Sequence, residues 1–431
     1  MGVQYEINAS TRRAAGNGLP GREDRLSLIT SRRKKEYTET ERVIFLKVFF
    51  VNSVCGVGST GRICTDLADE LAKNGDFCEI AYGRGTAPER FRELSRKLSG
   101  EPRVRWNAAK ARLLDNEGFN AAGPTRRLVE RIRAFDPDVI HLHNLHGYYL
   151  NVEVLFDYLR GCGKKVIWTL HDCWPMTGHC AYFSFANCDR WESGCFQCPQ
   201  IDKYPKAIPH GNVKRNYLRK KACFSDVPGL TIVTPSAWLA ELVGRSFLGK
   251  TETVVIHNGI NTEVFRPCQS DFRARYQLEN KRIILGVSSV WSESKGFPDF
   301  LKLSELLDED TRIVLVGLSD ELLRRLPENV IGIRRTNNAA ELAEIYSAAD
   351  VFFNPTRQDN YPTINLEAQA CGTPVITYAT GGSVESVPPE NVIPAGDLEA
   401  FLRKLEGPLE IAKLDFSKQT MMREYIKLYR K

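Results

Sequence analysis

From Val351 to Thr377 the chain reads VFFNPTRQDNYPTINLEAQACGTPVIT, a sequence that predicts three successive elements of secondary structure. A short apolar strand should end at Asn354, and the polar loop after it carries Asp359. A helix should then begin near Thr363, and Pro374–Thr377 should form the next strand. Strand, helix and strand in this order predict a βαβ unit with parallel strands.

The same alternation of short β-rich runs with amphipathic segments extends over most of the chain, in two series. The strands expected in the first series are Val43–Val51, Phe77–Tyr82, Val139–Leu142, Lys165–Leu170, Leu230–Thr234 and Glu252–His257. Those expected in the second are Arg282–Val287, Arg312–Val316, Val330–Ile333, Val351–Asn354 and Pro374–Thr377. A polar linker, 266–281, separates the series, so we predict two α/β domains, 43–265 and 282–414. The last segment, 415–431, has apolar residues at helical spacing and should dock on another element.

Length, charge and composition exclude several classes of protein. The 431 residues leave room for two or three domains. The net charge is only +6, and the first 42 residues, which we expect to be a flexible extension, hold 9 basic and 6 acidic side chains. No compact basic segment indicates nucleic-acid binding. Val43–Val51 is too short to span a bilayer, and no secretory signal opens the chain, so reduced thiols or metal ligands are expected of the 12 cysteines.

A glycine-rich turn follows the first expected strand. Gly56, Gly58 and Gly61 allow close backbone approach, and the N–H groups of the following helix favour an anion. The spacing also satisfies the dinucleotide fingerprint of nicotinamide-dependent oxidoreductases. That fold needs an acidic residue at the end of the second strand, whereas Ile80–Arg84 contains none. A tight turn without a ligand is the alternative interpretation.

Four cysteines lie in a loop rich in aromatic residues, 172–205. Cys180, Cys188, Cys195 and Cys198 follow the pattern C-x7-C-x6-C-x2-C, which can surround a tetrahedral ion. We therefore predict a structural zinc site that orders this loop. Cys173 or His179 could replace one ligand; free buried thiols or a disulfide are the alternatives.

Four histidines follow expected strands. His141, His143 and His146 belong to one strand end, and His171 to the next. Carboxyl ends of parallel strands are where α/β proteins bind ligands. His171 is the strongest candidate, while a hydrogen-bonded structural ring is the alternative for a lone histidine.

Two carboxylates flank the start of the expected helix at Thr363. Asp359 in the loop and Glu367 in the first turns can accept hydrogen bonds from sugar and ribose hydroxyls, and the helix N-terminus attracts phosphate. An ordinary capped helix with a surface glutamate is the alternative.

Taken together, these motifs resemble glycosyltransferase family 4, the retaining, nucleotide-sugar-dependent enzymes of GT-B fold. The resemblance covers about 43–387. It rests on Gly56–Gly61, Thr169–Asp172, Pro235–Trp238, Asn258–Asn261 with Phe265 and Pro267, Lys295–Gly296, Leu366–Ala368 and Cys371–Val375. The cysteine-rich loop is similar to that of a bacterial subset that makes exopolysaccharide, capsule or lipopolysaccharide. The resemblance implies two Rossmann-like domains facing a central cleft, with 415–431 crossing back to the first domain.

The resemblance also assigns residues. It places Glu367 on the nucleotide ribose, Asp359 and His171 at the donor sugar, and Lys295 on the diphosphate. Aspartate stands at 359 where the family usually has glutamate, and Val290 stands where it usually has arginine. Arg357 and Arg62 are the candidates to replace that arginine. The further residues expected to bind the donor are Gly56, Gly58, Asn360, Tyr361, Pro362, Thr363 and Ile364, and those expected to bind the acceptor are Asn144 and His146.

The implied activity is retaining transfer of a sugar from a UDP- or GDP-linked donor to a growing, lipid-linked bacterial surface glycan. The implied leaving-group chemistry uses lysine and helix N-termini without a catalytic metal, which fits a chain without an Asp-x-Asp motif. We expect a cytoplasmic protein with the inner-membrane surface as a further partner. A catalytically silent GT-B protein that binds a glycan or a partner is the alternative.

Overall fold

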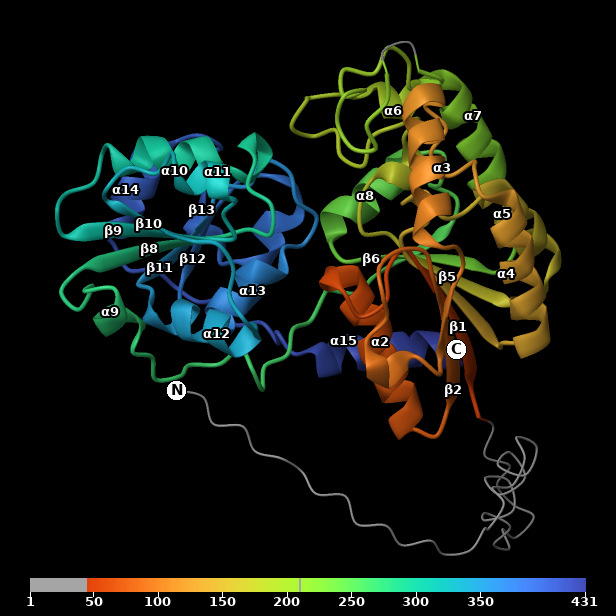
Figure 1. Cartoon of the computed structure of the whole chain (residues 1–431), viewed down its shortest axis with the longest axis horizontal. Coiled ribbons are helices and arrows are strands. Elements are labelled where there is room, and N and C mark those ends of the chain that lie inside the picture. The colour runs from red at the N-terminus through yellow and green to blue at the C-terminus, as the bar shows by residue number, and fades with distance from the viewer. Residues whose placement is uncertain (1–44, 209–210) are drawn as a thin grey trace, which may run out of the picture. The chain divides into compact units, whose positions relative to one another are not determined.

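The computed structural model describes residues 45–208 and 211–431 of the chain, so the expected extension 1–42 lies outside the described residues. Seven parallel strands form the first sheet, in the order β3-β2-β1-β4-β5-β6-β7 (Figure 1). They are β1 (Lys47–Asn52), β2 (Phe77–Tyr82), β3 (Ser95–Lys97), β4 (Val139–Leu142), β5 (Lys165–Thr169), β6 (Leu230–Thr234) and β7 (Glu252–Val255). The central strands are buried on both faces, which is why they read as nearly continuous apolar runs.

Helices cover both faces of this sheet. They are α2 (Gly58–Lys73), α3 (Glu101–Leu114), α4 (Ala122–Phe135), α5 (Val152–Gly161), α6 (Arg190–Ser193), α7 (Val213–Phe224) and α8 (Ala237–Arg245), with 3-10 turns at Glu89–Phe91 and Trp174–Met176. Their apolar faces form one core cluster on each side of the sheet. The connections after β1, β4 and β5 therefore meet at one edge, where the strands end.

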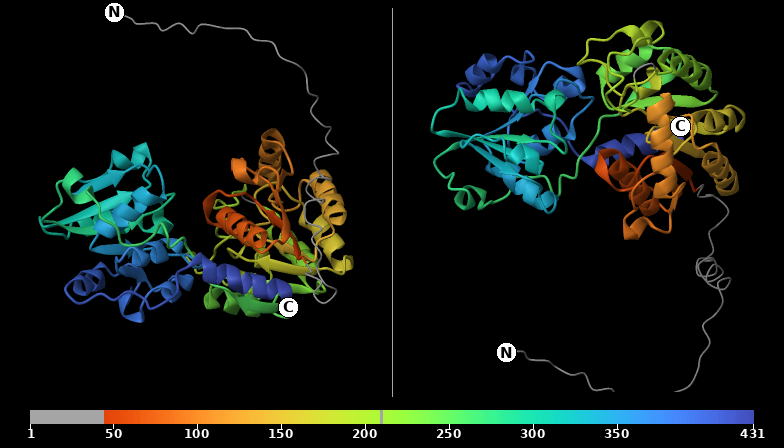
Figure 2. Two further views of the ribbon diagram at one scale, coloured as in Figure 1. Left: turned by 90° about the horizontal axis from the view of Figure 1, so that it is seen from below. Right: turned by 45° about the horizontal axis from the view of Figure 1, so that its top comes forward.

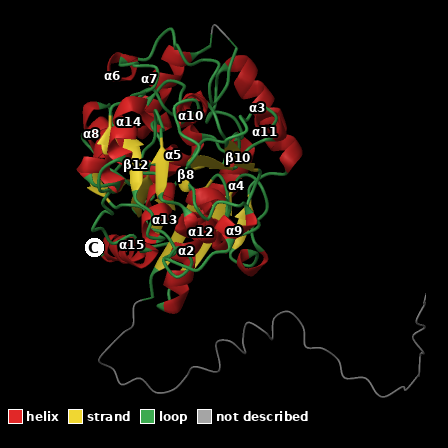
Figure 3. Ribbon diagram, turned by 90° about the vertical axis from the view of Figure 1, so that its left-hand side faces the viewer, coloured by secondary structure: helices red, strands yellow, loops and turns green. Residues whose placement is uncertain are grey.

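The second sheet has six parallel strands, in the order β10-β9-β8-β11-β12-β13. Its strands are β8 (Arg282–Val287), β9 (Thr311–Val316), β10 (Val330–Ile333), β11 (Val351–Asn354), β12 (Val375–Tyr378) and β13 (Val392–Ile393). Its helices are α9 (Phe272–Arg275), α10 (Phe297–Ser304), α11 (Asp320–Leu323), α12 (Ala339–Ala348), α13 (Thr363–Ala370) and α14 (Leu398–Leu405), with 3-10 turns at Glu293–Lys295, Gly381–Ser386 and Pro389–Asn391. Red helices enclose the yellow strands in Figure 3.

The last helix, α15 (Lys418–Arg430), packs on the first sheet beside α2, as Figures 1 and 2 show. Tyr425 and Tyr429 are buried in the core cluster on that face of the sheet. Lys418 Nζ lies 2.7 Å from Asp66 Oδ1, and Arg430 lies 2.7 Å from Asp76 Oδ2. The chain therefore returns to its first domain, as the resemblance implies.

The expected fold class is confirmed, and most expected strands agree with the observed ones within two residues. Two strands were not expected. β3 is three residues long and reads Ser-Arg-Lys, and β13 has only two residues, so neither shows an apolar run. The expected strand Glu252–His257 stops at Val255, where the chain leaves the sheet edge. No described helix combines the length and apolarity that are needed to cross a bilayer.

Candidate functional site

A cavity of about 840 Å³ lies where the strands of both sheets end. Its walls come from the connections after β1, β4, β5, β6 and β7 on one side, and after β8, β9, β10 and β11 on the other. The residues that the sequence analysis selected and that line it are Gly58, Asn144, His171, Lys295, Asp359, Asn360, Tyr361, Pro362, Thr363, Ile364 and Glu367. Gly56 and His146 were also expected there, and the cavity lining does not include them.

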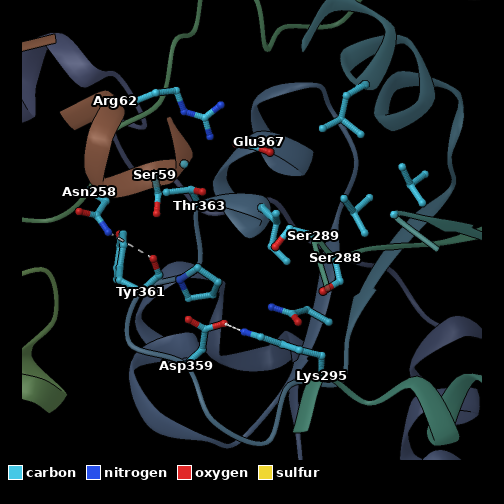
Figure 4. Close-up of a pocket in the computed structure, with 18 of the residues that line it drawn as sticks. Ser59, Arg62, Asn258, Ser288, Ser289, Lys295, Asp359, Tyr361, Thr363 and Glu367 are labelled. Atoms are coloured by element: carbon cyan, nitrogen blue, oxygen red, sulfur yellow. Dashed lines mark hydrogen bonds and ion pairs between the residues drawn. The ribbon is translucent and has the colours of Figure 1, made fainter. Parts of the chain in front are cut away.

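Lys295 and Asp359 form an ion pair at the second-domain wall of the cavity (Figure 4). The ammonium Nζ lies 2.6 Å from Asp359 Oδ2, and the backbone N–H of Asn360 donates to Asp359 Oδ1 at 3.0 Å. The two loops are also joined through their backbones, since the Arg357 N–H donates to the Ser294 carbonyl at 2.8 Å. Lys295 is thus a positioned cation rather than a freely rotating surface side chain.

Glu367 lies in α13 with 6% of its surface exposed. Burial raises the pKa of its carboxyl group to about 7, and two neighbours oppose this shift: the positive charge of Arg62 and a hydrogen bond from the Tyr346 hydroxyl, 3.3 Å from Oε2. A carboxyl group so well shielded from water is a strong hydrogen-bond acceptor for ligand hydroxyls once it is ionised. No sequence motif indicated Tyr346 as its partner.

The two arginines that could replace the missing family arginine differ in position. Arg62, in the first turns of α2, lines the cavity and is shown near Glu367 in Figure 4. Arg357 donates to both carboxylate oxygens of Asp299, at 3.0 and 2.8 Å, and is not part of the lining. The structure therefore favours Arg62, because the charge of Arg357 is already paired with Asp299.

The glycines of the turn after β1 have two different roles, one in the shape of the turn and one at the cavity. Gly56 has φ of 67°, its N–H donates to the Gly61 carbonyl, and an added Cβ would lie 2.6 Å from Pro88, so Gly56 shapes the turn. Gly58 and Ser59 open α2 at the cavity. No side chain caps this helix start and no acidic residue lies in its first turn, so its N-terminal N–H groups remain suited to an anion.

His171 follows β5 and reaches the cavity from the first domain. Its Nε2 lies 3.0 Å from Nδ1 of His143, and the two rings stack with 12° between their planes. Burial lowers the pKa of His171 to about 4, so the ring is neutral near pH 7. Its backbone carbonyl accepts from Asn360 Nδ2 at 3.3 Å and from the Tyr182 hydroxyl at 3.4 Å. The ring is thus held in position as a neutral hydrogen-bonding group.

The other histidines have structural partners. His141 contacts the Tyr429 hydroxyl at 2.6 Å and the Thr169 hydroxyl at 2.8 Å, which ties the sheet to α15. His146, expected to bind the acceptor, places Nε2 2.7 Å from Asp172 Oδ2 and Nδ1 3.0 Å from the Tyr204 hydroxyl. Its ring is occupied in holding Asp172, and it is Asp172 that lines the cavity.

Contacts join the two domains directly beside the cavity. The Ser236 hydroxyl lies 2.5 Å from Asn360 Oδ1, and the ring of His257 stacks on Tyr361 with centroids 4.7 Å apart. The carboxylate of Glu385 accepts from the backbone N–H groups of Ala237 and Trp238, both at 2.7 Å, at the start of α8. Glu385 could not be identified from the sequence, because a partner 148 residues away leaves no local pattern.

The cysteine-rich loop holds its thiols in a reduced form. Cys180, Cys188, Cys195 and Cys198 are all free. A hydrogen bond with Cys180 lowers the pKa of the Cys198 thiol to about 6 and raises that of Cys180. In residues 45–208 and 211–431, no three His, Cys, Asp or Glu side chains are arranged so that they could hold a metal ion. The disulfide alternative is absent from this loop, and the zinc ion stays a prediction.

Comparison with known proteins identifies two family models in the chain. The model described as "Glycosyltransferase Family 4" matches residues 60–264, and the one described as "Glycosyl transferases group 1" matches residues 281–410. The first covers the first sheet without β1, and the second covers the whole second sheet and its helices except α9. Together they account for most of the described chain.

Relatives of known name and structure agree with this match. The colanic acid biosynthesis glycosyl transferase WcaC of Escherichia coli (strain K12) is 23% identical over 403 residues, which cover 86% of this chain and 96% of WcaC. The solved sucrose-phosphate synthase from Thermosynechococcus elongatus superposes with a TM-score of 0.64 at 18% identity, covering 89% of this chain and 98% of the synthase.

Anabaena HepE, solved in complex with UDP and glucose, has a TM-score of 0.60 at 14% identity and covers 89% of this chain and 99% of its own. These likenesses show the GT-B fold, and they leave no support for the oxidoreductase interpretation of the glycine-rich turn. With both of its domains matched by the family models, the chain belongs to glycosyltransferase family 4 and is a glycosyltransferase of GT-B fold.

Proposed function

We propose that this glycosyltransferase transfers a sugar from a UDP- or GDP-linked donor, with retention of anomeric configuration, to a growing lipid-linked bacterial surface glycan. The observation that carries the proposal is one cavity with positioned cations, a buried carboxyl group and a neutral histidine, contributed by both sheets. The named relative WcaC supports the surface-glycan acceptor, and the solved HepE complexes with UDP and UDP-glucose support the donor class.

The diphosphate of the donor would lie between Lys295, Arg62 and the N-terminal N–H groups of α2. Each of these groups is positively charged or carries a partial positive charge, and all line the same cavity. Charge that builds up on the leaving diphosphate is stabilised best by groups that are already in place. The Lys295–Asp359 pair provides such a group, since the carboxylate fixes the ammonium before the donor enters.

The nucleoside and sugar would occupy opposite ends of the cavity. Glu367 would accept hydrogen bonds from the ribose hydroxyls, and Asp359 would contact the donor sugar. His171, neutral and held by His143, would face the sugar from the first domain. Asn144 and Asp172 line that same domain wall, where the acceptor hydroxyl would approach.

The transfer step then needs no protein acid or base. The acceptor hydroxyl oxygen forms a bond to the anomeric carbon on the face from which the diphosphate departs, and the carbon–oxygen bond to the diphosphate breaks. The acceptor proton passes to the departing phosphate oxygen, so the charges balance. Asp359 and Glu367 act as binding groups in this scheme. The catalytically silent alternative is motivated in part by Val290, which stands where the family usually has arginine. In our proposal Arg62 supplies that cation from the first domain.

A donor screen tests the proposal. Purified full-length protein is incubated with a lipid-linked glycan acceptor and a panel of UDP- and GDP-sugars, and mass spectrometry follows release of the nucleoside diphosphate and formation of the glycosylated product. We expect turnover of one donor class, with the anomeric configuration of the product unchanged when it is assigned by NMR. An inverted product would overturn the retaining mechanism, and silence toward every donor would overturn the donor class.

A further inference from the structure

Helix α3 presents an apolar stripe to solvent. Pro102, Trp106, Ala109 and Leu113 are all exposed, and their spacing of four, three and four residues places them on one face. Trp106 is 62% exposed and Leu113 is 65% exposed. The opposite face of α3, which includes Val104 and Ala111, is buried against the domain. A helix that covers the core with one face and shows a second apolar face to solvent indicates a binding surface.

Basic side chains flank this stripe on both sides. At 100° per residue, Arg103 and Lys110 lie along one border of the stripe, and Arg105 and Arg112 lie along the other. None of the four takes part in an ion pair with a described residue. The one acidic residue of α3, Glu101, is already paired with Lys97 at 2.6 Å. The Lys110 ammonium lies 5.5 Å from the centre of the Trp106 ring, so charge and apolar surface are adjacent.

A second basic element continues the surface. From Lys203 to Lys221 the sequence has 7 basic residues and no acidic one; of these, Lys220 is buried and Arg219 is paired with Glu153, so neither adds to the surface. On α7, Leu218 is 53% exposed. Its exposed neighbours are the basic residues Lys214, Arg215 and Lys221.

The two elements are physically joined. The Asn212 side chain donates to the Leu114 carbonyl at 2.7 Å, and the Ile208 N–H donates to the Arg112 carbonyl at 3.0 Å. Figure 1 shows α7 beside α3. We call the exposed residues of α3 and α7 together the α3–α7 surface.

The α3–α7 surface is connected to the cavity through one loop. The Asn107 side chain, on the inner face of α3, donates to the Tyr148 carbonyl at 2.9 Å. Tyr148 belongs to the connection after β4, and Asn144 of the same connection lines the cavity. A partner held on α3 would therefore lie against the domain that we expect to bind the acceptor.

We propose that the α3–α7 surface docks on an anionic lipid bilayer, with α3 lying in the plane of the interface. Tryptophan and leucine fit the boundary between headgroups and acyl chains, and arginine and lysine on both borders meet lipid phosphates. A second copy of the chain fits this surface poorly, because a symmetric contact would bring the same unpaired cations together. The exposed apolar stripe distinguishes this surface from a basic patch for nucleic acid, where charge alone would suffice.

Vesicle flotation of the full-length chain tests the proposal without any need for transferase activity. Two double variants are compared with the wild type: Arg105→Glu with Lys110→Glu, and Trp106→Ser with Leu113→Ser. The matched controls are Lys302→Glu and Leu306→Ser, which change exposed residues of the second domain. Thermal unfolding of each variant verifies that the fold is retained.

We expect the wild type to float with vesicles that contain phosphatidylglycerol, and much less with pure phosphatidylcholine. Each double variant should bind at least about tenfold more weakly, added salt should weaken the wild type, and the controls should be unaffected. Undiminished binding of the Arg105→Glu/Lys110→Glu variant would overturn the proposal. Self-association that depends on Trp106 and occurs in the absence of vesicles would also overturn it. A preference for duplex DNA that the Trp106→Ser/Leu113→Ser variant retains would overturn it as well.

Discussion

Nζ of Lys295 lies 2.6 Å from Oδ2 of Asp359, so the cation proposed for the diphosphate and the carboxylate proposed for the sugar are bound to each other. The pair joins the connection after β8 to the connection after β11, two neighbouring strands of the second sheet. About one third of the lysine side chain and less of the aspartate are exposed, so solvent weakens the attraction only in part. Each residue therefore sets the position and the effective charge of the other.

Replacing Asp359 should separate nucleotide binding from transfer. In Asp359→Asn, Lys295 no longer shares its charge with a carboxylate, so the affinity for free UDP or GDP should stay equal or rise by up to about tenfold. Transfer should fall by on the order of 100-fold, because the donor sugar loses its contact. Calorimetry gives the affinity and initial rates give the transfer. Loss of nucleotide affinity together with activity would argue against this division of roles.

Glu367 should reduce the stability of the free protein as the pH rises above about 4.5. Its folded pKa, about 7, is raised above the ordinary value of 4.5, so the native state favours the protonated carboxyl group. The stability penalty is therefore absent at low pH and grows as the pH rises from about 4.5 through 7.

Glu367→Gln removes this titration. At pH 8 it should increase the free energy of unfolding by about 3 kcal/mol, and at pH 5 by no more than about 1 kcal/mol, from roughly 1.4 kcal/mol per pKa unit. Denaturant titration at the two pH values measures both quantities, and transferase activity should fall in the same variant. An equal gain at both pH values would mean that ionisation of Glu367 is not the cause.

The contact of Glu385 with the start of α8 should control how well the two domains come together on the donor. Glu385→Gln removes a full negative charge from two backbone N–H groups, an interaction worth about 1 kcal/mol. We expect KM for the donor to rise by roughly fivefold with kcat little changed. Glu390→Gln, an exposed change in the same domain, is the matched control. A lowered kcat at constant KM would contradict an effect on domain association.

A zinc ion on the cysteine-rich loop would appear in the metal content of the purified protein. The spacing of the cysteines predicts roughly one equivalent by elemental analysis, lost in Cys195→Ser and Cys198→Ser, with a lower unfolding temperature in both variants. The described arrangement, in which no three potential ligands of residues 45–208 and 211–431 surround one point, predicts no bound metal. Cys162→Ser is the control, since Cys162 lies outside the loop and its thiol donates to the Leu159 carbonyl. Metal-free wild-type protein with an ordered loop would show that the thiols pack without an ion.

The sequence predicts the residues that reach the cavity better than it predicts their partners. His171, Asp359 and Glu367 follow strands in the sequence, and parallel strands bring their carboxyl ends to one edge, so position indicated them, whereas Lys295 was assigned by the family resemblance. Their neighbours are set by packing over long sequence distances. Nothing in the local pattern around His171 indicates His143 as the ring partner, 28 residues away.

Two residues that the sequence suggested as ligand-binding groups are bound instead by such protein partners. Arg357 stands next to Asp359 in the candidate motif, yet Asp299 of α10 binds its guanidinium. His146 follows its strand as an acceptor ligand would, yet Asp172 and Tyr204 take both of its ring nitrogens. In both cases the residue type and the position were suitable, and a buried or partly buried partner from another element decided the role.

If the cavity between the two sheets is the nucleotide-sugar site, UDP or GDP should bind there, and calorimetry measures that affinity. The wild type is compared with Lys295→Ala, Arg62→Ala and the control Lys302→Ala, an exposed lysine of α10. We predict that one of the two nucleotides binds, that each cavity variant weakens it at least about tenfold, and that the control leaves it unchanged. Equal affinity in all four proteins, or no binding of either nucleotide, would mean that this cavity is not the nucleotide-sugar site.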